Sequence, residues 1–161
     1  MDKKDQFVQL IKTNEGIIHK ITIVYSNNAA DQEDLYQEIV YQLWKSYDSF
    51  RGDAKISTWI YRIALNSCIT HINKEKRSGY RVPVDLELLN IAAEPDNATE
   101  ERLAILYAEI KKLGTIEKAI ILLFLEGNSH EEIAMITGFT KTNIGTRIGR
   151  IKEKLRSQIK Q

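Results

Sequence analysis

Apolar residues recur at three- and four-residue spacing along most of this chain, which predicts amphipathic helices, whereas the alternation typical of strands is weak. A first helix is expected to end at Asn27-Asn28, a second to run from about Asp31 to Tyr47, and a third from about Lys55 to Lys76. Their inward residues are expected to be Phe7, Leu10, Ile11, Ile17, Ile18, Ile21 and Val24, then Leu35, Ile39, Leu43 and Trp44, then Ile56, Ile60, Ile63 and Ala64. Three long helices can share one core, so residues 1–77 are expected to form a domain.

Both prolines of the chain and an excess of acidic residues mark residues 78–99 as a flexible acidic linker. Helical periodicity resumes from about Thr99 to Leu113, and Thr115 is expected to cap an apolar helix over 116–125. Residues 100–161 are therefore expected to form a second domain of four helices. The predicted fold class is all-α, with two small helical domains.

The segment 126–155 has the pattern of a helix-turn-helix. Ser129 and Glu132 are spaced as a capping box, and Gly138 can adopt the positive φ that ends the short helix. Thr140 is expected to cap a second helix, in which Ile144, Ile148, Ile151 and Leu155 form an apolar stripe on an otherwise basic surface. A basic helix that follows a tight turn suits the major groove of DNA.

The net charge of +1 conceals a strong asymmetry along the sequence. Residues 85–109 hold seven acidic residues and one basic residue, whereas residues 138–161 hold seven basic residues and one acidic residue. The net charges of these segments are therefore −6 and +6, and the basic end is the expected site of nucleic-acid contact.

Other features exclude several classes of protein. We find no apolar run long enough to span a membrane and no signal peptide, and the single Cys68 favours a reducing compartment, so a cytoplasmic protein is expected. The three histidines are scattered and have no spaced partners, so the sequence predicts no metal site, no cofactor and no catalytic residues.

Within the basic helix, the residues expected to face the bases are Lys141, Thr142, Asn143, Thr146 and Arg147. Lys141 and Arg147 suit guanine and Asn143 suits adenine, while Arg150, Lys152 and Lys154 are expected to hold phosphates. Gly145 and Gly149 each cost about 1 kcal/mol relative to Ala inside a helix. Either they permit close approach to a backbone or they only weaken the helix.

Two further groups of residues lie in the first domain. Asp34, Gln37 and Glu38 share the polar side of the second helix, where an acidic surface favours a protein partner over DNA, although an ordinary solvated face explains the spacing equally well. Trp59 and Tyr61 cannot both face one core, so one of them is expected near the surface beside Arg62, where it can stack on an unpaired base. The alternative is that both rings only pack at the rim of the core.

The runs DLYQEIVYQLWKSYDSFRGDAKISTWIYRIALN and LEGNSHEEIAMITGFTKTNIGTRIGRIKEKL resemble the extracytoplasmic-function (ECF) group of bacterial RNA polymerase sigma factors. The resemblance covers nearly the whole chain and implies a protein that binds core polymerase, recognises promoter DNA and promotes strand opening. It also implies an anti-sigma factor as a partner. The family commonly has other residues at Thr70 and Asn73, and usually larger ones at Gly145 and Gly149.

The resemblance also implies roles for particular residues. Those implied to dock on the polymerase are Asp34, Leu35, Gln37 and Glu38. Those implied to bind the proximal promoter element and the melted non-template strand are Phe50, Arg51, Gly52, Lys55, Trp59, Tyr61, Arg62 and Asn66. Further along the same helix, the basic charge expected at this site is carried by Lys74, Lys76 and Arg77. Those implied to read the distal element are Thr140, Lys141, Thr142, Asn143, Thr146, Arg147 and Arg150, next to the expected phosphate contacts Lys152 and Lys154.

Two other functions are compatible with part of these features. A stand-alone helix-turn-helix regulator needs neither the acidic block nor the aromatic third helix. A helical adaptor that sequesters a protein partner leaves the basic helix unused. A sigma factor uses all three features.

Overall fold

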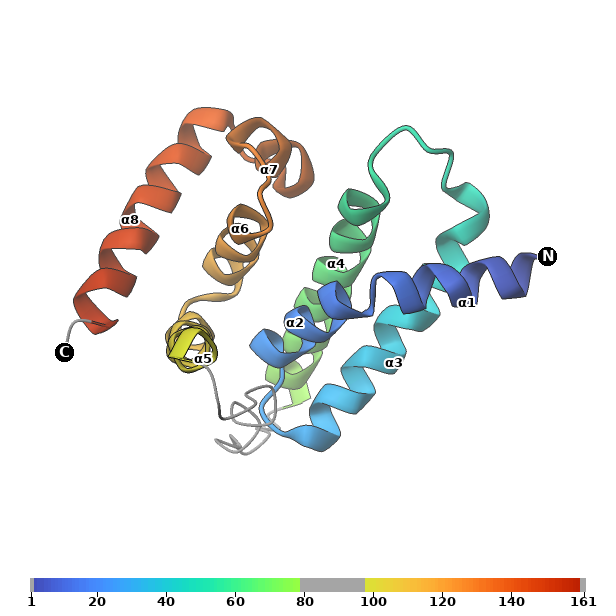
Figure 1. The fold of residues 1–161 in the computed structure, drawn as a ribbon, viewed down its shortest axis with the longest axis horizontal. Coiled ribbons are helices and arrows are strands. Elements are labelled where there is room, and N and C mark those ends of the chain that lie inside the picture. The colour runs from blue at the N-terminus through green and yellow to red at the C-terminus, as the bar shows by residue number, and fades with distance from the viewer. Residues whose placement is uncertain (1, 79–97, 160–161) are drawn as a thin grey trace. The chain divides into compact units, whose positions relative to one another are not determined.

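The computed structural model describes residues 2–78 and 98–159, and all regular structure in these ranges is helical. The chain divides into two compact units, one containing α1 to α4 and the other α5 to α8 (Figure 1). The all-helical, two-domain prediction is thereby confirmed. Most of the segment expected as an acidic linker, residues 79–97, lies outside the described residues.

In the first unit, α1 (Lys3–Thr13) and α2 (Glu15–Tyr25) precede α3 (Ala29–Ser46), a short 3-10 turn η1 (Tyr47–Ser49) and α4 (Ile56–Ser78). Helices α2, α3 and α4 pack against one another, and α1 contacts α2. Ile18, Leu35 and Ile60 each have an exposed fraction of 0% and lie at the centre of the apolar core. The expected three-helix core is thus formed by α2, α3 and α4.

The expected first helix is in fact two helices, because the chain turns at Asn14. The Asn14 backbone N–H donates to the carbonyls of Leu10 and Ile11, and its side-chain Nδ2 donates to the Leu10 carbonyl at 2.9 Å. A short amide side chain that bonds its own backbone competes with helical hydrogen bonding, and here it ends α1. A continuous apolar stripe does not reveal such a break.

A second correction concerns Trp44, which is 37% exposed and not directed into the core. Its ring packs at the surface against Phe7 of α1, with 5.0 Å between the ring centroids. The other predicted inward residues of α3, Leu35, Ile39 and Leu43, have exposed fractions of 0%.

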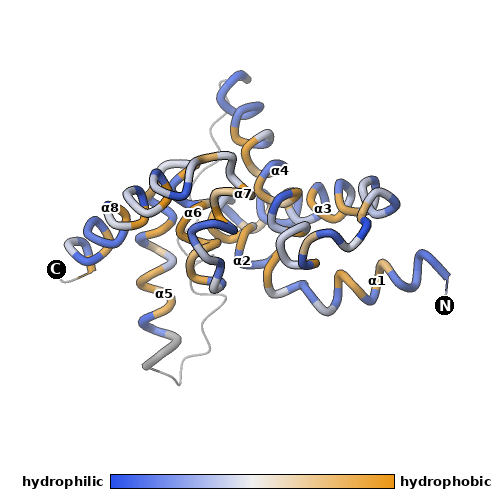
Figure 2. The backbone as a smooth tube through the Cα atoms, turned by 90° about the horizontal axis from the view of Figure 1, so that it is seen from above, coloured by the Kyte–Doolittle hydropathy of each residue, from blue (hydrophilic) through white to orange (hydrophobic). Residues whose placement is uncertain are grey.

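The second unit contains α5 (Ala98–Lys111), α6 (Thr115–Leu125), α7 (His130–Thr137) and α8 (Lys141–Ile159). Helix α8 packs against the other three, and α6 is the most apolar of the four along the tube in Figure 2. Residues 119–123 of α6 are buried. The predicted four helices are confirmed, but Thr115 is the first residue of α6 and Gly114 is its N-cap, which has no side chain to cap with.

Among the described helices, none combines the length and the apolar character needed to cross a membrane.

Candidate nucleic-acid and protein interfaces

The helix-turn-helix forms through the local contacts that the sequence predicted. The Ser129 Oγ accepts from the Glu132 N–H at 3.1 Å, and the Glu132 carboxylate accepts from the Ser129 N–H at 3.3 Å, which completes a capping box. Gly138 ends α7 with φ of 86°, and the Thr140 Oγ1 accepts from the Asn143 N–H at 3.1 Å. These caps fix the turn between α7 and α8.

Packing then decides which side of α8 faces the solvent. Ile144, Ile148, Ile151 and Leu155 are all buried, as predicted. The opposite side exposes Lys141, Thr142, Asn143, Thr146, Arg150 and Lys154. A surface of cations and short polar side chains at the start of this helix can contact both phosphates and base edges.

Two contacts within the second unit hold the Arg147 side chain in place. Its Nε donates to the Asn143 Oδ1 at 2.7 Å, and its guanidinium carbon lies 4.5 Å from the centroid of the Phe139 ring. Stacking on an aromatic face and a fixed hydrogen bond both reduce the rotamer freedom of the guanidinium group. Phe139, in the turn, was missed as a functional residue, because one aromatic next to a glycine gives no sign of what stacks on it.

The other basic side chains of α8 differ in their contacts and in their exposure. Lys141 pairs with Glu131 of α7 at 3.1 Å, and both groups are well exposed. Lys152 is half-buried, and its Nζ lies 4.4 Å from the centroid of the Phe124 ring of α6. Lys152 therefore contacts α6 as well as adding to the positive charge of this side.

In the first unit, the outward side of α3 exposes Asp34, Gln37 and Glu38, whereas Leu35 has an exposed fraction of 0% and belongs to the core. Beside this acidic surface lies an open apolar groove. Its lining residues are Phe7, Tyr36, Gln37, Val40, Tyr41 and Trp44. Partial burial, and secondarily Glu15, raise the pKa of Tyr36.

An apolar groove that adjoins acidic residues is typical of a surface that binds a protein, since its centre is apolar and its rim is polar. We call the groove and the three exposed polar residues the α3 docking face. Sequence reasoning found the polar residues and missed the groove. The exposed aromatic residues Tyr41 and Trp44 were the signal that could have revealed it.

The loop before α4 and the start of that helix share a row of aromatic rings. The Trp59 ring lies 4.9 Å from Phe50 and 6.5 Å from Tyr47, between ring centroids, and Gly52 turns the loop with φ of 78°. Arg51, Gly52 and Lys55 are exposed, and Phe50 and Trp59 are half-buried.

The position of Tyr61 differs from the one that the resemblance implied. It is 1% exposed and belongs to the core, so its ring is not presented to a ligand, whereas Trp59 is the aromatic residue near the surface. The two rings differ by about 200° around the helix axis, and only one of those directions faces α2 and α3. The remaining candidates on α4 are exposed, namely Arg62, Asn66, Lys74, Lys76 and Arg77.

A helix-turn-helix joined to a second helical unit that has an acidic, apolar face and a basic, aromatic helix is the combination expected of a transcription factor that works with RNA polymerase. Comparison with known families agrees, since sigma-70 region 2 matches residues 10–78 and sigma-70 region 4 matches residues 103–155. The chain is 30% identical over 155 residues to the ECF RNA polymerase sigma-E factor of Escherichia coli strain K12, covering 88% of this chain and 81% of that relative. The corresponding factor of Salmonella typhimurium strain LT2 gives the same identity and coverage.

Solved structures show the same fold. The sigma factor RpoE of Bartonella quintana, in complex with the anti-sigma factor NepR, has a TM-score of 0.75 at 21% identity, covering 98% of this chain and 96% of that one. CnrH, in complex with the cytosolic domain of CnrY, has a TM-score of 0.67 at 23% identity, covering 98% and 90%. This chain belongs to the ECF family of RNA polymerase sigma factors. It is therefore a non-enzymatic initiation factor that acts with core polymerase at promoter DNA.

Proposed function

We propose that the two units have different roles in initiation. Residues 1–77 dock on the polymerase and promote strand opening, and residues 100–161 read the distal element. The observation that supports this proposal is the chemical character of the surfaces that the two units expose. The first unit presents an acidic and apolar face on one helix and a basic, aromatic side on another, while the second presents a capped, basic recognition helix. Each surface has the character that its proposed partner requires.

On the first unit, the α3 docking face binds the polymerase. Asp34, Gln37 and Glu38 make direct contact, and the buried Leu35 holds the helix in place from the core. The apolar groove supplies the desolvated centre of this interface, and the acidic residues set its register and exclude nucleic acid.

The proximal promoter element and the opened non-template strand bind along the loop at 50–55 and α4. Trp59 offers a ring for base stacking, and the exposed cations and amides hold the backbone. These polar residues are Arg51, Lys55, Arg62, Asn66, Lys74, Lys76 and Arg77. The buried Tyr61 packs in the core of the unit and is not itself a contact.

The distal element is read by the first turns of α8. Arg147, Asn143 and Lys141 are proposed to contact base edges, with Thr140, Thr142 and Thr146 beside them. Arg150, Lys152 and Lys154 contribute charge toward the phosphates. Such a protein works where polymerase and chromosome are, so a cytoplasmic location is part of the proposal.

An anti-sigma factor is the proposed regulator of this chain. The sigma factor RpoE, which has the same fold, forms such a complex with the anti-sigma factor NepR, and CnrH, also of this fold, forms a complex with the cytosolic domain of CnrY. The α3 docking face and the recognition helix are the surfaces that such a protein must cover to prevent initiation.

The proposal is tested by adding purified protein to core polymerase on a library of genomic promoter fragments. A specific transcript that needs both the protein and core polymerase is expected. Tight binding of duplex DNA by the protein alone, with no specific transcript, would instead indicate a stand-alone regulator.

A further inference from the structure

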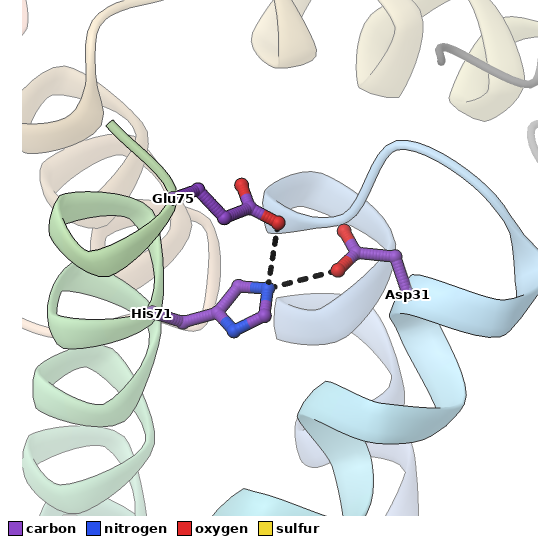
Figure 3. Close-up of side chains that lie close together, drawn as sticks. All are labelled: Asp31, His71 and Glu75. Atoms are coloured by element: carbon purple, nitrogen blue, oxygen red, sulfur yellow. Dashed lines mark hydrogen bonds and ion pairs between the residues drawn. The ribbon is translucent and has the colours of Figure 1, made fainter. Parts of the chain in front are cut away.

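Three side chains from two helices meet at one point in the first unit, and none of them belongs to the contacts proposed above (Figure 3). Asp31 lies in the first turn of α3, and His71 and Glu75 lie one turn apart on α4. The His71 Nε2 lies 2.8 Å from the Asp31 Oδ1 and 3.2 Å from the Glu75 Oε1. The cluster thus joins residues 40 positions apart in the sequence.

The two carboxylates converge on one ring nitrogen, which can carry only a single hydrogen. That hydrogen can be donated fully to one carboxylate and only partly to the other. The Asp31 side chain is 6% exposed, and those of Glu75 and His71 are 21% and 23% exposed, so solvent screens the two acids poorly. A divalent cation among these three side chains would offset the charge of both carboxylates.

The geometry of the ligand atoms fits such a centre. One atom from each residue, an imidazole nitrogen or a carboxylate oxygen, lies within 4.8 Å of the other two. Zinc bonds to nitrogen and oxygen are about 2.0–2.2 Å long, so three ligand atoms that lie this close together can approach a single ion.

The surroundings also orient one of the ligands. The second oxygen of Asp31, Oδ2, accepts from the Asn27 N–H at 3.1 Å, and the Asp31 N–H donates to the Asn28 side chain at 2.8 Å. The Asn27 bond holds the carboxylate with Oδ1 directed into the cluster, as outer-shell partners do for metal ligands, while the Asn28 bond caps the start of α3.

We propose that Asp31, His71 and Glu75 bind a divalent transition-metal ion of the zinc type, with water completing its coordination. The imidazole favours zinc and its neighbours over Mg²⁺ and Ca²⁺, and two carboxylates without a thiolate do not suit Cu(I). The bound ion cross-links the start of α3 to the later turns of α4. It thereby stabilises the end of α4, next to Lys74, Lys76 and Arg77.

The test uses the full chain, with Zn²⁺ titrated against a chromophoric chelator and Co²⁺ followed by visible absorption. One ion per chain and a melting temperature that rises with Zn²⁺ are expected. His71→Ala, Asp31→Asn and Glu75→Gln should each weaken Zn²⁺ binding by more than the roughly 10–100-fold typical of outer-shell changes. The matched control is His19→Ala, which removes an exposed histidine of the same unit and should leave the affinity unchanged.

Several results would overturn the proposal. They are the absence of saturable Zn²⁺ binding, equal affinity for Mg²⁺, or wild-type affinity in His71→Ala. A Co²⁺–thiolate band would place the ion on Cys68 and have the same consequence. If Asp31→Asn does not fold, as judged by circular dichroism, Glu75→Gln decides the matter, because Glu75 is the more exposed of the two acids.

Discussion

At the scale of single residues, Arg147 is the side chain best prepared for its proposed role. The Asn143 amide at 2.7 Å and the Phe139 ring beneath it hold the guanidinium group in one orientation before DNA binds. A side chain that is ordered in advance loses less conformational entropy on binding. The same contacts link Asn143 to Arg147, so the two proposed base contacts are expected to act together.

We predict that Arg147→Ala weakens binding to the distal element by about 1–3 kcal/mol and relaxes preference at one base pair. Arg150→Ala is the matched control, since it is exposed on the same helix but is proposed to contact phosphate. It should weaken binding to all sequences alike and lower the salt dependence. Fluorescence anisotropy on a set of single-base variants measures both effects. A uniform loss for Arg147→Ala would make Arg147 a phosphate contact.

Substitutions of Trp59 and Trp44 are predicted to impair different steps of initiation. Trp59→Ala should impair strand opening, because a base that stacks on a ring gains about 1–3 kcal/mol. Trp44→Ala should instead weaken polymerase binding and leave opening normal once polymerase is saturated. Permanganate reactivity of unpaired thymines reports opening, and a polymerase titration reports binding. Normal opening with Trp59→Ala would assign Trp59 to packing alone.

At the scale of elements, α8 contains two glycines that its own packing does not require. A Cβ at Gly145 would lie 3.5 Å from the His130 ring, which is an ordinary contact, and a Cβ at Gly149 would meet none of the described atoms within 4 Å. Gly138 differs, since its φ of 86° is one that an L-residue rarely adopts. The backbone conformation therefore requires a glycine at Gly138, whereas a requirement for glycine at Gly145 or Gly149 would have to come from a bound ligand.

We predict that Gly149→Ala stabilises the second unit by about 1 kcal/mol, the usual helix-propensity difference. Gly138→Ala should destabilise the same unit, since its conformation is incompatible with a side chain. Urea unfolding monitored by circular dichroism measures both. If Gly149→Ala stabilises the fold but weakens DNA binding, Gly149 serves close approach to the DNA backbone. Unchanged DNA binding would mean that the glycine only weakens the helix.

At the scale of the whole molecule, the α3 docking face of one unit and helix α8 of the other have opposite charge and are expected to be impaired independently. The α3 docking face is acidic and apolar, and α8 is basic. Because the partners differ, damage to one surface should leave the other function intact.

We predict that the double substitution Asp34→Lys and Glu38→Lys abolishes polymerase binding without affecting the affinity for distal-element duplex DNA. A charge-reversal control is Glu101→Lys, at an exposed acidic residue of α5 in the other unit, and this variant should bind polymerase normally. Co-elution with core polymerase and anisotropy on duplex DNA provide the two readouts. Polymerase binding that survives the double substitution would move the interface away from α3.

Much of this fold is local, and the sequence predicted those parts. The capping box at Ser129, the positive φ of Gly138 and the Thr140 cap depend on residues within four positions of one another. The apolar stripe of α8 follows helical spacing alone, and all four of its members are buried. The break at Asn14 was missed because it depends on one side-chain hydrogen bond and not on a periodic pattern.

The sequence by itself thus determined the helices, the helix-turn-helix, the charge asymmetry and the family, because each is written in spacing and composition. Only the tertiary structure decided that Trp59 and not Tyr61 lies near the surface, that aromatic residues form a groove beside Asp34, and that Phe139 supports Arg147. It also brought Asp31 to His71 and Glu75, where the sequence predicted no metal site. Such contacts depend on how helices pack, and packing is set by side chains far apart in the chain.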